Sequence, residues 1–140
     1  MNKFFSSSPI WPTTALTLVR LFVGAFMIYH GWEVFSKEDM NKYMEWDMFK
    51  GSSTARIMVY AGKASELIGG ILLFIGFLTR LAALILIGTM IYITFFVGNG
   101  KIWMDAQHPF LFVLLAIVFL VMGGGRWSVD HLLSKSRNHA

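Results

Sequence analysis

Two long apolar runs joined by one tight polar turn constrain this chain most. The stretch from Glu66 to Met90 reads ELIGGILLFIGFLTRLAALILIGTM, with Thr79-Arg80 as the polar interruption. The chain is 56% hydrophobic and 14% charged, whereas soluble proteins contain about 25% charged residues. Because the apolar residues fall in long runs, the sequence predicts an integral membrane protein.

Four apolar runs predict the architecture. We expect an all-α integral membrane bundle of four transmembrane helices, folded as one domain over residues 1–140. The expected spans cover about residues 15–35, 56–78, 81–97 and 104–124. The last run is short, because Phe110–Met122 must be extended at both ends to cross about 30 Å of hydrocarbon.

An interfacial loop, residues 36–55, separates the first two spans and carries charges of both signs. Met40, Tyr43, Met44 and Met48 recur within it at near-helical spacing, which predicts a short amphipathic helix lying on the membrane. A solvated loop with interfacial aromatic residues fits the same pattern equally well.

Small residues mark the second span as a helix-packing element. Gly62, Gly69 and Gly76 recur every seven residues, and small residues at such spacing let helix backbones approach closely in lipid. Glu66 stands four residues after Gly62 and three before Gly69. We therefore expect Glu66 to point into a tight helix–helix contact rather than into lipid.

Arg20 is the predicted partner of Glu66. It lies four residues before Gly24 in the first span, so it shares that helix face. An unpaired charge at the bilayer centre costs about 2.5–3.5 kcal/mol, and both residues are expected near mid-membrane. We therefore predict a buried ion pair between Arg20 and Glu66, which either fixes helix register or belongs to a functional site.

A second polar group is expected on the side of the bundle away from the chain termini. The candidates for this polar pocket are His30, Glu33, Lys63, Tyr92 and His108. Histidine and carboxylate groups can relay the protons that quinone reduction consumes. Alternatively, the Glu33 and Lys63 side chains reach the interface and His30 bonds a backbone carbonyl.

Several function classes are excluded or disfavoured. The chain has no cysteine, so disulfides, thiolate nucleophiles and iron–sulfur ligation by this chain are excluded. The net charge of +4 suits anionic lipid headgroups, and no nucleic-acid motif is present. We name no catalytic residue. We also favour no metal site, although His30 and Glu33 have helical spacing and His108 could add a third ligand.

Four segments together resemble the DoxX family. They are Arg20 with His30-Gly31, ELIGG at 66–70, GFLTRLAAL at 76–84 and GGGRWSVD at 123–130. The resemblance implies a small four-helix protein of the prokaryotic inner membrane with both termini in the cytoplasm. The positive-inside rule by itself leaves the orientation tied, because similar numbers of basic residues flank both sides of the bundle.

The chain departs from the family pattern at two places. Val34 stands where relatives often carry a lysine, and Gln107-His108 stands where they often carry an acidic residue. A family mechanism that uses those charges is therefore not carried over to this chain.

The resemblance also implies a function. Some relatives are membrane subunits of oxidoreductase assemblies, including quinone-linked sulfur oxidation, and more distant ones are membrane chaperones or cargo adaptors. We expect an accessory or membrane-anchor subunit that binds a quinone or other lipophile in the bundle, beside a membrane-protein partner or a second copy. The alternative is a non-enzymatic adaptor or chaperone that scaffolds another membrane protein. Whether the chain has catalytic activity of its own is left open by the sequence.

Overall fold

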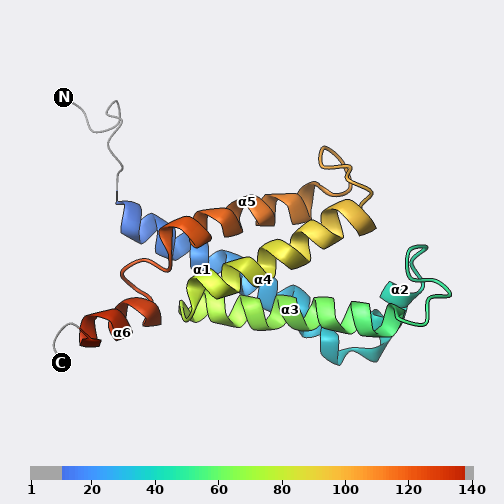
Figure 1. Ribbon diagram of the computed structural model, residues 1–140, viewed down its shortest axis with the longest axis horizontal. Helices are drawn as coiled ribbons and strands as arrows, with labels where there is room; N and C mark the ends of the chain where they lie inside the picture. The colour runs from blue at the N-terminus through green and yellow to red at the C-terminus, as the bar shows by residue number, and fades with distance from the viewer. Residues whose placement is uncertain (1–10, 138–140) are drawn as a thin grey trace.

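The computed structural model describes residues 11–137, a range that is helical and contains no strand. The elements are α1 (Pro12–Gly31) continued by the 3₁₀ segment η2 (Trp32–Phe35), α2 (Lys37–Met44), α3 (Ala55–Ile75), α4 (Thr79–Tyr92) continued by the π segment η3 (Ile93–Val97), α5 (Gln107–Met122) and α6 (Val129–Arg137). Four long helices, α1, α3, α4 and α5, run along one axis, with α6 at one end and α2 at the other (Figure 1). The predicted all-α bundle is confirmed.

Within residues 11–137, three helical segments are long and apolar enough to cross a membrane. They are Pro12–Phe35, Ala55–Ile75 and Thr79–Val97. The fourth helix, α5, has 16 residues and is therefore about 24 Å long, short of the roughly 30 Å hydrocarbon core. The predicted extension of this span back to residue 104 does not form, because Trp103 and Met104 lie in an exposed turn.

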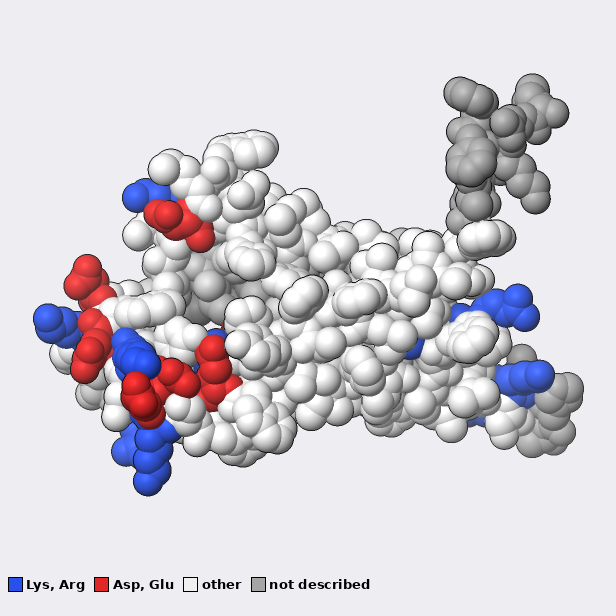
Figure 2. All heavy atoms as spheres, turned by 180° about the vertical axis from the view of Figure 1, so that it is seen from behind, with Lys and Arg blue, Asp and Glu red and all other residues white. Residues whose placement is uncertain are grey.

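The charged residues gather at the two ends of the bundle. Figure 2 shows acidic and basic side chains at the α2 end, basic ones at the α6 end, and a broad uncharged surface between them. Large apolar side chains on that surface, such as Phe22, Ile68, Leu84 and Val121, are exposed. An exposed apolar surface of this extent indicates direct contact with lipid.

Helices α1 and α3 are in contact through their backbones. A Cβ atom added at Gly24 would lie 2.7 Å from Phe74 N, and one added at Gly31 would overlap Leu67 N. On α3 the glycine that meets α1 is Gly70, whereas Gly69 packs against Leu86 of α4. Glycines therefore permit this antiparallel contact, as small residues do between membrane helices.

The hairpin between α3 and α4 turns earlier than predicted. Gly76 ends α3 with φ +71°, Phe77 N donates to Leu72 O at 3.0 Å, and Thr79 already begins α4. The turn therefore occupies residues 76–78 and not Thr79-Arg80. A residue in the left-handed conformation ends the helix here, and the polar pair belongs to the first turn of the next helix.

The core consists of two apolar clusters. The larger lies between the four long helices and contains Val23, Met27, Leu73, Ala82, Ala83, Leu86, Met90, Val113, Ala116 and Phe119. In the smaller, Met40 of α2 and Phe49 of the following loop pack against Ala55 and Val59 of α3. Ser36 Oγ accepts a hydrogen bond from Asp39 N and caps α2. The predicted helix therefore forms only over Lys37–Met44, whereas residues 45–54, including Met48, form turns.

We predict that Gly31→Ala lowers the free energy of unfolding by about 1–3 kcal/mol, because the new methyl group would overlap the backbone of Leu67. Gly88→Ala is the matched control, since an added Cβ there meets nothing within 4 Å. The measurement is denaturation of both variants in detergent, monitored by circular dichroism. Equal stability of the two variants would contradict the backbone contact.

Candidate functional site

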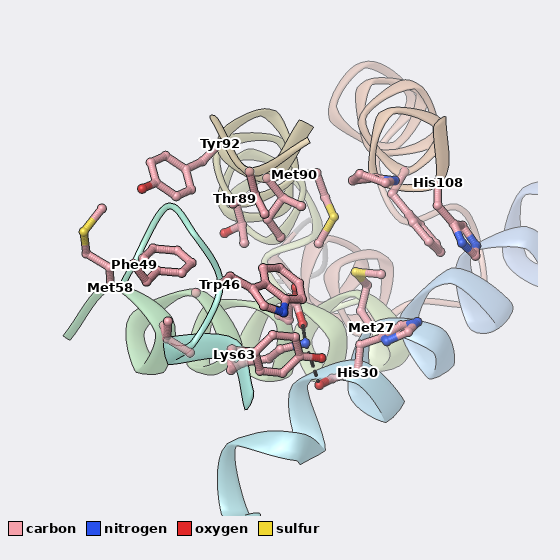
Figure 3. Close-up of a pocket in the computed structure, with 18 residues that line it drawn as sticks. Met27, His30, Trp46, Phe49, Met58, Lys63, Thr89, Met90, Tyr92 and His108 are labelled. Atoms are coloured by element: carbon pink, nitrogen blue, oxygen red, sulfur yellow. Dashed lines mark hydrogen bonds and ion pairs between the residues drawn. The ribbon is translucent and has the colours of Figure 1, made fainter. Parts of the chain in front are cut away.

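A cavity of about 220 Å³ lies at the α2 end of the bundle, between the four long helices. Its side chains come from α1, α3, η3, α4 and α5, and from α2 with the loop after it (Figure 3). Most of the wall is apolar, and it includes Met27, Phe49, Met58, Val59, Met90, Ile93, Val97, Pro109 and Phe112. An apolar cavity of about 150 Å³ is enough to hold benzene. This one therefore has room for a single substituted ring.

Lys63 is the centre of the polar network at the cavity wall. Its Nζ lies 3.1 Å from Glu66 Oε2 and 2.9 Å from Glu33 Oε2, and it also donates to His30 O at 3.4 Å. The exposed fraction of the side chain falls from 27% at Glu33 to 12% at Lys63 and 5% at Glu66. The network thus runs from the protein surface to a buried carboxylate that borders the cavity.

Tyr43 of α2 completes this network from outside the membrane-spanning helices. Its hydroxyl donates to Glu33 Oε2 at 2.5 Å, and Lys63 Nζ lies 4.6 Å from the centre of its ring. Burial is the main cause that raises the pKa of Tyr43 above its ordinary value, and the hydrogen bond to Glu33 raises it further. Tyr43 therefore stays protonated and remains a donor to Glu33.

Arg20 and Glu66 do not form the predicted ion pair. The backbone contacts pair Gly24 with Phe74 and Gly31 with Leu67, so Glu66 lies at the level of residue 32 of the first span. Arg20 is twelve residues from that level, about 18 Å at 1.5 Å per residue. The register of α1 against α3 separates the two charges, so that each side chain bonds to a group near its own end of the bundle.

Arg20 lies instead beneath the C-terminal segment. Its guanidinium donates to Trp127 O at 2.6 Å and packs against Gly76. Nε and Nη1 have no hydrogen-bond partner within residues 11–137. The side chain is 1% exposed, so it joins α1 to the turn between α3 and α4 and to the segment before α6.

Asp130 fastens the same segment to the hairpin. Its Oδ1 accepts from Leu78 N at 2.7 Å, its Oδ2 accepts from Thr79 N at 2.8 Å, and its own N–H donates to Gly76 O at 3.0 Å. Burial opposes ionisation, but these bonds and the nearby charge of Arg20 lower the pKa of Asp130 below its ordinary value. The carboxylate therefore caps the start of α4 from a distant part of the chain.

The structure brings the other predicted polar residues together. Those that line the cavity are His30, Lys63, Glu66, Tyr92 and His108. Glu33 does not line it, but it joins the site through Lys63 and Tyr43. Glu33 and Lys63 lie 2.9 Å apart, so in the alternative arrangement, in which both side chains reach the interface, they would do so as a pair. Within the described residues, no three histidine or acidic side chains come together in a way that could hold a metal ion.

Two features of the site were not predicted. Tyr43 reaches Glu33 across the break between η2 and α2, a contact that helical periodicity cannot show. The hydroxyl of Tyr92 is buried without a hydrogen-bond partner in the described chain. The signal that could have placed Tyr43 was the cap at Ser36, which sets where α2 begins.

Comparison with known proteins decides the family. The sequence model of the DoxX family matches residues 15–99, which run from α1 to the turn after η3. The chain belongs to the DoxX family. An uncharacterized membrane protein of Mycobacterium tuberculosis, Rv3486, is 29% identical over 158 aligned positions, covering 93% of this chain and 92% of that protein. No solved structure gives a significant match to this DoxX protein.

We predict that Lys63→Gln lowers the free energy of unfolding by about 3–5 kcal/mol, because it leaves Glu66 buried without a counter-charge. The double variant with Glu66→Gln should recover most of that loss. Lys42→Gln is the control: Lys42 also pairs with a carboxylate, at 2.9 Å from Glu38, but on the exposed surface. This variant should leave the free energy of unfolding unchanged, because solvent screens an exposed pair. The measurement is denaturation in detergent, and additive losses in the double variant would count against the pair.

We predict that Asp130→Asn destabilises the protein by about 1 kcal/mol near neutral pH, because the cap on α4 loses its charge. Since the pKa of Asp130 is lowered in the folded protein, its stabilising effect is present above the ordinary value of about 3.9. The effect disappears as the pH falls through the lowered pKa. Melting curves of both proteins should therefore converge on acidification. A constant difference down to about pH 2 would contradict this assignment.

Proposed function

We propose that this DoxX protein binds a quinone, or a lipophile of similar shape, in the cavity at the α2 end. In this proposal it acts as an accessory or membrane-anchor subunit of an oxidoreductase assembly. The observation that carries the proposal is the cavity itself, with apolar walls and a buried carboxylate, Glu66, at one side. Ligand pockets commonly combine apolar walls with a few placed polar groups.

The polar network supports proton transfer to such a ligand. A bound quinone would supply the redox chemistry, because it accepts electrons together with protons. Hydrogen bonds link Glu66 through Lys63 to Glu33 and Tyr43, which lie nearer the surface. His30 and His108 also line the cavity, and histidine is a common proton-transfer group in proteins. This chain's contribution would be to hold the ring and to pass protons along that line, while a partner subunit provides electrons.

The proposal includes a membrane and an orientation. We propose the prokaryotic inner membrane, with α5 as the fourth span and both termini in the cytoplasm. The chain would form one domain. The uncharged surface between the two charged ends supports a position across the bilayer (Figure 2). The resemblance to DoxX proteins supports cytoplasmic termini, which would place the cavity in the half of the bundle far from the cytoplasm.

The test is lipid analysis of the protein purified from native membranes. Gly62→Leu should fill the cavity, because Gly62 lines it and a Cβ there meets nothing within 4 Å. Gly88→Leu makes the same change at an equally open position that does not line the cavity. We predict that quinone is retained by the wild type and by Gly88→Leu, and that Gly62→Leu retains at least about tenfold less.

Two outcomes would overturn the proposal. One is a wild-type protein that carries no quinone or other lipophile, and the other is equal retention by all three proteins. Mass spectrometry of the co-purified proteins tests the assembly. An oxidoreductase subunit among them supports the anchor role. A partner of another class, with an empty cavity, favours the adaptor or chaperone function instead.

A further inference from the structure

A groove of about 490 Å³ opens to the outside of the bundle between α1 and α5. Its walls are α1 residues from Leu18 to Phe26 and α5 residues from His108 to Leu115. The groove exists because α1 packs mainly on α3 and α5 packs mainly on α4, so that α1 and α5 meet at few points. One of these points is an edge-to-face contact between Phe26 and Phe112, whose ring centres are 6.5 Å apart.

We propose that this groove holds the hydrocarbon tail of the lipophile whose ring lies in the cavity, and that the ligand enters sideways from the membrane between α1 and α5. The inference rests on the proposed function and extends it. It specifies the ligand class as a ring with a long apolar tail, and it assigns separate parts of the protein to the two halves of the ligand.

The groove and the cavity are adjacent. His108 and Phe112 line both of them. The two rings stack with centres 5.8 Å apart and an angle of 13° between them. Figure 3 shows the His108 ring extending from α5 toward α1. A molecule that crosses from the cavity to the groove would pass from the polar network to a wholly apolar channel.

The chemistry of the groove selects a hydrocarbon chain as its occupant. Apart from His108, the groove is lined by leucine, valine and phenylalanine side chains. It lies on the uncharged surface that faces lipid, where an extended peptide segment would leave backbone N–H and C=O groups without partners. An alkyl or isoprenoid tail has no such groups and buries apolar area along the groove.

The sizes of the two spaces also fit this division. The cavity, at about 220 Å³, has room for a substituted ring but not for a ring with a long tail. The groove extends along α1 from Leu18 to Phe26, a distance of about 12 Å at a rise of 1.5 Å per residue. A tail leaving the cavity past His108 therefore has an apolar path of that length before it reaches the α6 end.

The experiment compares two probes, a benzoquinone with a decyl tail and the same ring with a methyl group in place of the tail. Val19→Trp places a large side chain in the groove. Val118→Trp is the matched control, because both valines are 42% exposed and Val118 lines neither space. Dissociation constants are measured by calorimetry in detergent. We expect Val19→Trp to weaken binding of the decyl probe about tenfold and to leave the methyl probe unchanged, while Val118→Trp changes neither.

A second pair of variants guards against a folding defect. Leu111→Trp blocks the groove from α5, and Leu114→Trp is its control outside the groove, with exposures of 47% and 46%. Equal affinity of the decyl probe for the groove variants and their controls would overturn the inference while leaving the proposed function in place. If the wild type binds neither probe, both fail. If a groove variant loses both probes, the tail-specific role of the groove is refuted.

Discussion

The backbone contact between α1 and α3 is the constraint on which the rest of the structure depends. Gly24, Gly31 and Gly70 let the two helices touch without intervening side chains. Such a contact allows little sliding, because backbone atoms cannot change rotamer to make room. The register of α1 against α3 is therefore set, and with it the depth at which every polar group in the bundle lies.

The two polar clusters follow from this register. At one end, Lys63 pairs with Glu66 on its own helix and with Glu33 across the helix contact. The cavity lies beside this group. At the other end, Arg20 faces the hairpin turn, where Trp127 and the segment carrying Asp130 cover it. The bundle thus has a structural charge cluster around Arg20 and Asp130 at one end, and a second cluster around Lys63 that borders the cavity at the other end.

The fold could be read from the sequence to a large extent, because long apolar runs and regularly spaced glycines have few other solutions in lipid. A glycine-mediated helix contact was predicted, but its α3 glycines were wrong: Gly70 meets α1, whereas Gly69 packs against α4 and Gly62 meets nothing. The partner of Arg20 was not predicted, because helical periodicity gives the face of a residue but not its level against a neighbouring helix.

Contacts between residues on different secondary-structure elements were the hardest to predict. Tyr43 reaches Glu33 only because α2 folds back onto α3, and Asp130 reaches Thr79 only because the C-terminal segment returns to the hairpin. Both contacts depend on loop geometry, for which the sequence offers turn residues but no distances. The family signature at 123–130 pointed to that segment without indicating what it binds.

The short length of α5 has a consequence for the surrounding lipid. In the proposed arrangement, with α5 as the fourth span, its 16 residues would leave it about 6 Å shorter than the average hydrocarbon core. Membranes accommodate such a mismatch by thinning locally around the short helix. The lipids bordering α5 would then be compressed beside the groove between α1 and α5. The thickness of the host membrane would therefore influence how that groove opens.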